Sequence, residues 1–532
     1  MRQFTFSYIL LLSIAFVLPL FAEEHLKLPN VLLILADDIG YGDFSCYNPQ
    51  GHIRTLELDR LAATGIRFTN AHSPAALCSP TRYAILTGNY PWRGRNPDGT
   101  WTYVGPTQFL PGQKTIGHFL QQAGYRTAMF GKAGIGTTYE RMISADVPDF
   151  NSKLSEGPIQ WGFDYSYIIP RGHQIGPYVY YENNILVGEP SKITMLEQED
   201  HWGRTKGFGI ADWDSSAIGQ TLTEKATAFI DKHLKQNRIE GKERPFLIHF
   251  CSDGAHAPYT PPQTLFGHQL AGATGMSART DMVLEIDILL RQFVKILKER
   301  NLYNNTVIIV TSDNGGLTLN DRKHFGHDAV GGLRGQKGSV WEGGHRVPLI
   351  IHWGDDTDAG SVIKPGTVTR QLVGLHDIVA TLSEIAGIEP GEDQSLDSVS
   401  LLPVLLGKQD ETIPIRDNLL IQSQYGYDTL PLGIPKEFQD KPFREYADFL
   451  TQKAHNEGFE GIGHAVITNR WKLILGLKDQ PEFLVDLNED LYERTNQISD
   501  TTQQQRINEY LSIYQTIRKS KRSIPPLRVT SP

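Results

Sequence analysis

The sequence is poor in cysteine, carries no surplus of positive charge, and has no long apolar run beyond its first residues. Its 532 residues include three cysteines, Cys46, Cys78 and Cys251, and an odd number leaves at least one outside any disulfide. The net charge of −9 argues against nucleic acid as the main partner. We find no transmembrane segment after the N-terminal run, no internal repeat and no low-complexity block.

The N-terminal residues predict a signal peptide. Arg2 precedes an apolar run over residues 8–21, and Ala22 gives way to the polar Glu23. The run is short for a membrane span, and Pro19 near its end favours cleavage. No cysteine follows directly, which argues against a lipid anchor. We therefore expect residues 1–22 to be removed, leaving a periplasmic or secreted protein without a membrane span.

The length of the chain and the pattern of its apolar runs predict two domains. A chain of 532 residues is too long for one compact domain. Over residues 23–410, continuous apolar runs alternate with amphipathic helices, which is typical of a mostly parallel mixed sheet between helices in an α/β fold. Over residues 411–532, shorter pieces predict a smaller antiparallel sheet with one helix. We read residues 184–215 as loop-rich and the basic tail beyond Ser520 as loosely ordered.

Two clusters of oxygen ligands follow predicted buried strands. Asp37 and Asp38 come directly after the apolar run 30–36, and Asp313 and Asn314 after the run 306–312. Adjacent carboxylates repel each other and need a cation or strong donors, and open α/β sheets bind ligands at the carboxyl ends of their strands. Oxygen donors favour calcium or magnesium over zinc. The alternative is a pair of solvated loops.

A helix start at Cys78 predicts an anion site. Pro80 suits the first turn of a helix, whose free N–H groups and dipole favour negative charge. Arg82, one turn along, would share a helix face with Cys78. A nucleophile beside an arginine is a candidate site for an anionic ester. The alternative is a small buried core residue, as most lone cysteines are.

Further basic residues occur at or near predicted strand ends. Lys132 follows the run 125–130, although a lone lysine is more often solvated. His256 lies in a proline-rich loop after the run 245–251 and is a candidate acid or base. Lys337 has glycines on both sides, which would allow the backbone to approach a ligand closely.

The run from Cys78 to Arg82, followed by Ile-Leu-Thr-Gly at residues 85–88, resembles the signature of the formylglycine-dependent (type I, arylsulfatase-like) sulfatases. The segments around Asp37, Lys132, His256, Asp313 and Lys337 are similar to that family as well, so the resemblance runs from about Pro29 to about Leu491. It implies an alkaline-phosphatase-like fold and a sulfuric ester hydrolase.

The resemblance also implies roles for these residues. A maturation enzyme would oxidise Cys78 to formylglycine (3-oxoalanine), whose hydrated aldehyde attacks sulfur and is stabilised by Arg82. Lys132, His256 and Lys337 would bind sulfate, and His256 or Lys337 would protonate the leaving oxygen. One calcium ion would be held by Asp37, Asp38, the modified Cys78, Asp313 and Asn314.

The expected substrate is a sulfate monoester on a carbohydrate or polysaccharide, of the algal or glycosaminoglycan type. This expectation rests on export and on an aromatic loop region in which Glu182, Trp202, Arg204 and Trp213 are candidates to line a cleft. One alternative is a phosphonate or phosphate ester hydrolase with the same site. The other is a catalytically dead carbohydrate-binding homologue.

Two adjacent positions depart from the family. After Lys132 the family shows tryptophan and histidine, where this chain has Ala133 and Gly134. That histidine hydrogen-bonds the formylglycine, so its loss leaves a gap. Our hypothesis is that His173 occupies the vacated space; the alternative is an ordinary loop histidine. If Cys78 is converted, Cys46 and Cys251 remain as a pair or as two free thiols.

Overall fold

The computed structural model describes residues 27–97, 105–144, 147–200, 203–317, 319–354, 357, 360–423, 463–476 and 478–529. The signal peptide expected at 1–22 lies outside these residues. Within them, the main sheet has ten strands. In spatial order these are β17 (Thr367–Thr369), β2 (Ile66–Phe68), β16 (Leu349–Trp353), β15 (Thr306–Ser312), β1 (Asn30–Ala36), β12 (Phe246–Cys251), β4 (Arg126–Lys132), β7 (Tyr165–Ile169), β8 (Tyr181–Glu182) and β9 (Ile185–Leu186).

The middle of this sheet is parallel and its flanks are mixed. β1 pairs in parallel with both β12 and β15, and the parallel run continues through β4 to β7. Every residue of β1, β12 and β15 is buried, as expected of parallel strands covered on both faces. β16 and β8 pair antiparallel with their inner neighbours. The predicted mostly parallel mixed sheet is confirmed.

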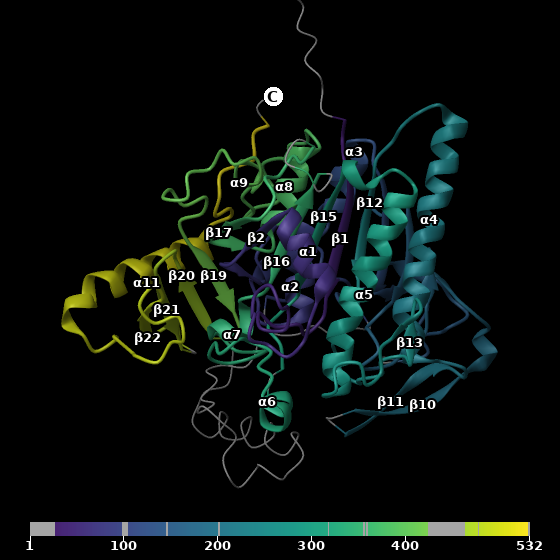
Figure 1. The fold of residues 1–532 in the computed structure, drawn as a ribbon, viewed down its shortest axis with the longest axis horizontal. Coiled ribbons are helices and arrows are strands. Elements are labelled where there is room, and N and C mark those ends of the chain that lie inside the picture. Colours follow the sequence, from purple (N-terminus) through teal and green to yellow (C-terminus); the bar gives the residue numbers. More distant parts are fainter. Residues whose placement is uncertain are drawn as a thin grey trace, which may run out of the picture.

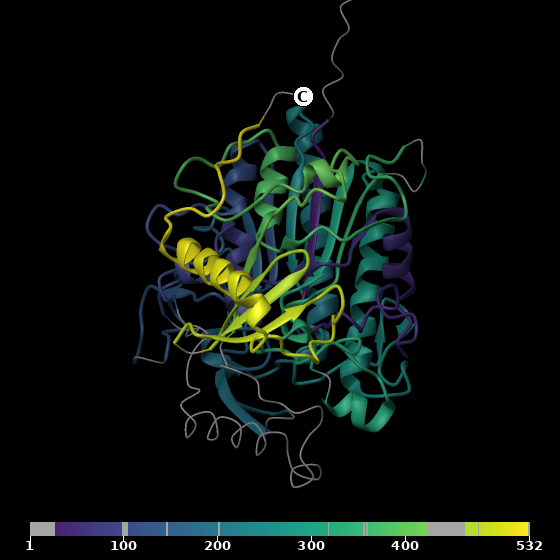
Figure 2. The ribbon, with the colours of Figure 1, turned by 90° about the vertical axis from the view of Figure 1, so that its left-hand side faces the viewer.

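Helices cover both faces of the sheet (Figures 1 and 2). Alternate residues of β1 enter two separate cores: Leu33 packs in one, and Leu32 packs in the other. The first core takes in residues of α2 (Cys78–Thr87), α3 (Ile116–Gln122) and α8 (Asp377–Ile385). The second takes in residues of α1 (Leu56–Thr64), α4 (Ile218–Glu240) and α5 (Ala278–Glu299). The period of two along β1 therefore assigns each helix layer to one face.

A smaller unit with its own core follows toward the C-terminus. Its antiparallel sheet consists of β19 (Leu419–Gln422), β20 (His464–Ile467), β21 (Trp471–Leu475) and β22 (Pro481–Asp486). The helix α11 (Gln504–Lys519) packs on these strands, as Figure 2 shows. The predicted antiparallel sheet with one helix is confirmed, and the boundary between residues 410 and 411 stays a prediction.

The segment predicted to be loop-rich, residues 184–215, contains a hairpin instead. β10 (Ile193–Asp200) and β11 (Gly203–Ile210) pair antiparallel along their whole length. Figure 1 shows this hairpin at the lower right, below α4 and α5. The prediction was wrong because these strands carry polar residues such as Glu197 and Lys206 and have no continuous apolar run.

The tail beyond Ser520 was predicted to be loosely ordered, and within the described residues it is held by many hydrogen bonds. The N–H groups of Ser523 and Ile524 lie 3.1 and 3.3 Å from the carbonyl oxygen of Leu396. The guanidinium of Arg522 donates to main-chain carbonyls of residues 391, 392, 394 and 395. Composition misled the prediction, because the partners of the tail lie more than a hundred residues earlier in the chain.

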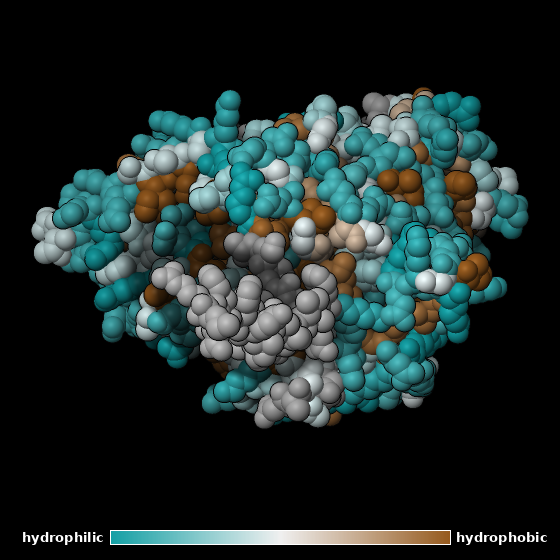
Figure 3. Space-filling model, turned by 90° about the horizontal axis from the view of Figure 1, so that it is seen from above, coloured by the Kyte–Doolittle hydropathy of each residue, from teal (hydrophilic) through white to brown (hydrophobic). Residues whose placement is uncertain are grey.

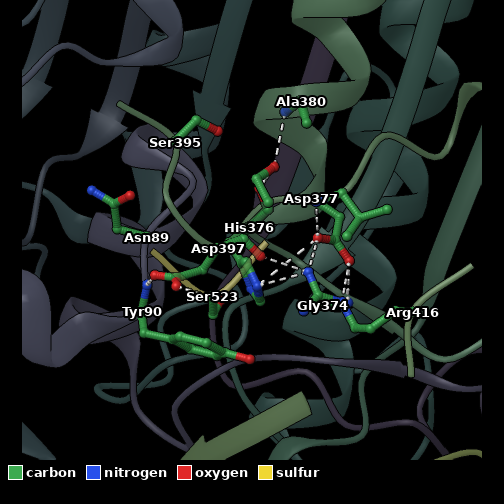
Figure 4. Close-up of polar contacts among 12 residues, drawn as sticks. Asn89, Tyr90, Gly374, His376, Asp377, Ala380, Ser395, Asp397, Arg416 and Ser523 are labelled. Atoms are coloured by element: carbon green, nitrogen blue, oxygen red, sulfur yellow. Dashed lines mark hydrogen bonds and ion pairs between the residues drawn. The ribbon is translucent and has the colours of Figure 1, made fainter. Parts of the chain in front are cut away.

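A buried polar network lies where the tail returns (Figure 4). Asp397 accepts hydrogen bonds from the Ser523 hydroxyl at 2.6 Å and from the Tyr90 N–H at 2.8 Å. Nearby, Arg416 donates to Asp377 through its Nε at 3.2 Å. The network thus joins the tail to the residues that follow α2 and to the start of α8.

The described cysteines are free thiols, so the unpaired alternative holds for Cys46 and Cys251. Cys251 is buried and lies 3.2 Å from the Nε2 atom of His249. Figure 3 shows mainly hydrophilic side chains on the face seen from above, with apolar side chains in small patches. None of the described helices has the length and apolar character needed to cross a membrane.

The tail contacts predict a stability effect. Arg522→Ala removes the donor of several carbonyl hydrogen bonds and should lower the unfolding free energy by about 1–3 kcal/mol. Arg528→Ala is the matched control, because Arg528 is 63% exposed and pairs only with surface glutamates in the described contacts, which stabilises by less than about 1 kcal/mol. Thermal denaturation of both variants measures the difference; equal losses would mean that the tail adds nothing specific.

Candidate active site

The carboxyl ends of neighbouring parallel strands bring the sequence-predicted residues to one edge of the main sheet. β15, β1, β12 and β4 lie side by side in that order and run in the same direction. Parallel strands end at the same edge, so side chains that close or follow them converge. These residues are Asp313 and Asn314 after β15, Asp37 and Asp38 after β1, His256 after β12, and Lys132 at the end of β4.

The helix α2 begins at Cys78, as predicted, with Pro80 in its first turn. All its residues are buried, and Cys78 is 4% exposed. The Cys78 sulfur and carboxylate oxygens of Asp37 and Asp313 lie within 4.8 Å of one another. The N-terminus of the helix therefore opens onto the acidic end of the sheet.

Arg82 connects the helix to two of these carboxylates. Its Nε and one terminal nitrogen lie 3.0 and 2.7 Å from Oδ2 of Asp313. The same terminal nitrogen lies 3.3 Å from Oδ2 of Asp37, and the other donates to the carbonyl of Lys132 at 3.1 Å. With 1% of its surface exposed, Arg82 is held in one position by charge-assisted bonds.

Two lysines contact the adjacent carboxylates. The Nζ of Lys132 lies 2.5 Å from Oδ2 of Asp37, and the Nζ of Lys337 lies 2.5 Å from Oδ1 of Asp38. The amide of Asn314 donates to the same Asp38 oxygen at 2.8 Å. These contacts bring Lys337, from the loop after α6 (Leu319–Phe325), to the strand ends.

Burial and neighbouring charges shift the pKa values of the carboxyl groups of the site in different directions. Burial raises the pKa of Asp37, but the charges of Lys132 and Arg82 outweigh burial and hold the pKa well below its usual range. Burial and the neighbouring Asp37 charge raise the pKa of Asp313 to about 7. Of these two carboxyl groups, that of Asp37 is therefore firmly ionised and that of Asp313 is easily protonated.

Three buried oxygens here accept no hydrogen bond from the described residues. They are Oδ1 of Asp37, Oδ2 of Asp38 and Oδ1 of Asn314. An unpaired buried carboxylate oxygen is unfavourable by several kcal/mol, roughly, unless a cation or donor reaches it. Carboxylate and amide oxygens are the ligands that a hard divalent cation prefers. The donor set thus fits a calcium or magnesium ion.

His256 is placed beside Asp38 with one ring nitrogen already bound. Its Nδ1 donates to the carbonyl of Ala257 at 2.7 Å, and its Nε2 lies 3.6 Å from Oδ2 of Asp38. Burial and the nearby charge of Lys337 lower the pKa of His256 to about 3. The ring is therefore neutral near pH 7, with Nε2 directed toward the acidic cluster.

Gly134 and Gly172, the residue before His173, both lie close to the side chain of Lys132. Gly134 has φ +68°, and a Cβ there would lie 3.2 Å from Cδ of Arg82. Gly172, next to His173, faces the methylene groups of Lys132 in the same way. His173 is buried and its ring lies 6.3 Å from that of His256. The structure thus brings His173 into the site, while its proposed replacement of the family histidine stays a hypothesis.

Sequence reasoning missed two residues next to this site. Asp253 is buried in the loop between β12 and His256, and its place after a buried strand was the available signal. Arg279 of α5 donates to Asp43 and to the carbonyl of Asp38, whose φ is +59°. Nothing in the helical pattern of α5 marked Arg279 as a support of this strained loop.

Of the residues suggested to line a cleft, Glu182 and Trp213 lie within the described residues, and their role in a cleft stays a prediction. Glu182 pairs with Lys225 at 3.1 Å, and the Trp213 ring lies tilted against that of Tyr180 with ring centroids 5.1 Å apart. Trp202 and the side chain of Arg204 lie outside the described residues.

Comparisons with known proteins find related sequences and a related fold. The family described as Sulfatase matches residues 29–388. An N-acetylgalactosamine-6-O-sulfatase of Bacteroides thetaiotaomicron is 30% identical over 427 residues, covering 72% of this chain and 78% of the relative. An N-acetylgalactosamine-6-sulfatase of Canis lupus familiaris is 30% identical over 396 residues, covering 73% and 68%. A structure solved in work on glycosaminoglycan metabolism by Bacteroides thetaiotaomicron has a TM-score of 0.72 and 26% identity, covering 92% and 99%.

The close approach of Gly134 to Arg82 predicts that a side chain at position 134 destabilises the protein. Gly134→Ala and Gly124→Ala both force alanine to a left-handed φ, which is unfavourable by about 1 kcal/mol. The new Cβ at position 134 would also press on Arg82, whereas position 124 has nothing within 4 Å. Thermal denaturation should therefore show a larger loss for Gly134→Ala. Equal losses would mean that Arg82 moves aside freely.

Proposed function

Because the chain belongs to the sulfatase family of the alkaline phosphatase superfamily and is a sulfuric ester hydrolase, we propose that it removes sulfate from a carbohydrate outside the cytoplasm. The observation that carries the proposal is the meeting of Cys78, at a helix N-terminus, with the cations Arg82, Lys132 and Lys337 around buried carboxylates. A sulfate monoester is anionic and gains negative charge on its leaving oxygen, so fixed cations are the expected source of catalysis.

The metal in this proposal is one calcium ion. Asp37, Asp38, Asp313 and Asn314 would hold it, and the oxygens of three of them that lack a donor support the assignment. When bound, the ion would add positive charge next to a sulfate oxygen and the nucleophile at position 78. It would also relieve the repulsion between neighbouring carboxylates.

Cys78 is the proposed nucleophile position, after oxidation to formylglycine by a maturation enzyme. The converted side chain would supply a hydroxyl nucleophile in place of the thiol. Arg82 and the N-terminus of α2 would stabilise negative charge that develops there. Asp313, within 4.8 Å of the Cys78 sulfur and bound by Arg82, is the candidate to accept the proton of the nucleophile.

Lys132, His256 and Lys337 would bind the sulfate group and the leaving oxygen. Burial lowers the pKa of Lys337, but the Asp38 charge outweighs it and raises the pKa, so the ammonium keeps its proton. His256 is neutral before substrate binds, because its pKa is lowered to about 3. Lys337 is therefore the better placed proton donor to the leaving oxygen, with His256 as a neutral partner.

The substrate class follows from the relatives. Two curated relatives at 30% identity are named for removing the 6-sulfate of N-acetylgalactosamine. We extend this to a sulfated hexosamine or galactose unit of a glycosaminoglycan or a related polysaccharide. Export, expected from the N-terminal residues, would place the enzyme where such polymers occur.

Sulfate release tests the proposal directly. The protein, produced together with a formylglycine-generating enzyme, should release inorganic sulfate from glycosaminoglycan oligosaccharides that carry 6-sulfated N-acetylgalactosamine. Cys78→Ala should reduce release by about a thousandfold or more. Mass spectrometry of the Cys78 peptide must show conversion in the active sample.

The alternatives give different results in the same assay. Phosphate or phosphonate release exceeding sulfate release would favour the ester hydrolase alternative. An unmodified Cys78 in the native host, without release of either anion, would favour a carbohydrate-binding protein without activity.

Removal of calcium tests the metal assignment. Chelation should lower both the melting temperature and sulfate release, and added calcium should restore both, because ligand binding to the folded state stabilises it. Asn314→Leu removes one oxygen ligand and should weaken the dependence of the melting temperature on calcium. Asn305→Leu, at the opposite end of β15, is the control that should keep it. A melting temperature independent of calcium in the wild-type protein would contradict the assignment.

A further inference from the structure

Two buried ionisable residues next to the site have no part in the proposed chemistry. His173 follows β7 and Asp253 follows β12, and they are 1% and 3% exposed. Strands β12 and β7 both pair with β4, which ends at Lys132. The two residues therefore reach the site from both sides of the strand that presents Lys132.

Both residues contact the main chain of His256. The ring of His173 contacts the His256 carbonyl oxygen through Nε2 at 2.9 Å, and only Nε2–H can donate to it. The N–H of His256 donates to the carbonyl oxygen of Asp253 at 2.8 Å. The peptide groups on both sides of the His256 Cα are thus fixed by this pair.

The second ring nitrogen of His173 faces the Asp253 side chain. Its Nδ1 lies 4.0 Å from Oδ2 of Asp253. Neither carboxyl oxygen of Asp253 accepts a hydrogen bond from the described residues. A carboxylate on one nitrogen of an imidazole orients the ring and makes the other nitrogen the donor. In His173 that donor is Nε2, which contacts the carbonyl oxygen of His256.

The same loop also supports Lys132. A Cβ on Gly172 would lie 2.8 Å from Cδ of Lys132, so the backbone before His173 rests against the lysine stem. The N–H of Gly134 donates to the carbonyl of Pro170 at 3.1 Å. The loop that carries His173 is therefore packed against the side chain of Lys132 and contacts the backbone of His256, and both of these residues are candidates to bind sulfate.

We propose that His173 and Asp253 are positioning residues for sulfate transfer, in which Asp253 orients His173 and His173 holds the His256 main chain beside Asp38 and Lys337. This inference rests on the assignment of His256 and Lys132 to sulfate binding. It accounts for a histidine and a carboxylic acid that are buried together next to the site.

A hydrogen bond from a buried histidine to a carbonyl also occurs away from the site. In α4, His233 is 2% exposed and its Nε2 lies 2.9 Å from the carbonyl oxygen of Arg244. The bond alone therefore does not identify a functional role. His233 instead supplies a matched control, with the same bond and burial but no contact with the site in the described residues.

The test compares His173→Leu, His173→Gln and His233→Leu in the metal-loaded, Cys78-converted protein. His173→Leu removes the donor, and we expect kcat for sulfate release to fall tenfold or more while KM changes less. Glutamine can place its amide N–H where Nε2–H lies, so His173→Gln should recover most of the loss. His233→Leu should lower the melting temperature but keep kcat.

Binding of inorganic sulfate, measured by calorimetry, gives a readout that needs no turnover. We expect His173→Leu to weaken sulfate binding several-fold and His173→Gln to restore it, even if the tested polysaccharides are not substrates. Loss of stability alone in His173→Leu, as in His233→Leu, would overturn the proposal. Equal damage from leucine and glutamine would overturn it too, because the ring would then act by other means than this hydrogen bond.

Discussion

The structure depends on the burial of several negative charges at one edge of the parallel sheet. Asp37, Asp38 and Asp313 are all fully buried, and two of them are adjacent in the chain. Removing an ion from water is unfavourable by several kcal/mol, roughly, unless opposite charge and hydrogen bonds replace the water. Arg82, Lys132 and Lys337 supply that charge from a helix, a strand and a loop. The arrangement of these elements follows from the need to balance the carboxylates.

The smaller C-terminal unit takes part in this arrangement. The N–H of Gln422 in β19 donates to the carbonyl of Pro74, and the Gln422 carbonyl accepts from Ala76, both at 3.0 Å. The carbonyl of Ala76 in turn accepts from Gly338 at 2.8 Å. The segment before Cys78 and the residue after Lys337 are thus bonded together beside β19. Removal of the C-terminal unit would leave Pro74 and Ala76 without their hydrogen bonds to Gln422.

The sequence allowed prediction of those features that have local causes. Continuous apolar runs marked β1, β12 and β15, and Pro80 marked the start of α2. The oxygen ligands were visible because they follow such runs directly. Features with distant partners were not visible: the carbonyls that bind Arg522, the support of Asp38 by Arg279, and the contact of His173 with His256 join segments far apart in the chain. The hairpin of β10 and β11 was missed because its strands have no continuous apolar run.

The burial of Cys78 bears on when the proposed conversion of this residue could take place. Cys78 is 4% exposed, and its sulfur lies within 4.8 Å of carboxylate oxygens of Asp37 and Asp313. The residues just before it, Pro74 and Ala76, are hydrogen-bonded to Gln422 of β19. An enzyme that binds an extended stretch of chain around Cys78 would have to unfold these contacts in the finished protein. The proposed conversion is therefore expected before the chain has folded, that is, before Gln422 has paired with residues 74–76. A slow-folding C-terminal unit would lengthen the time in which maturation can take place.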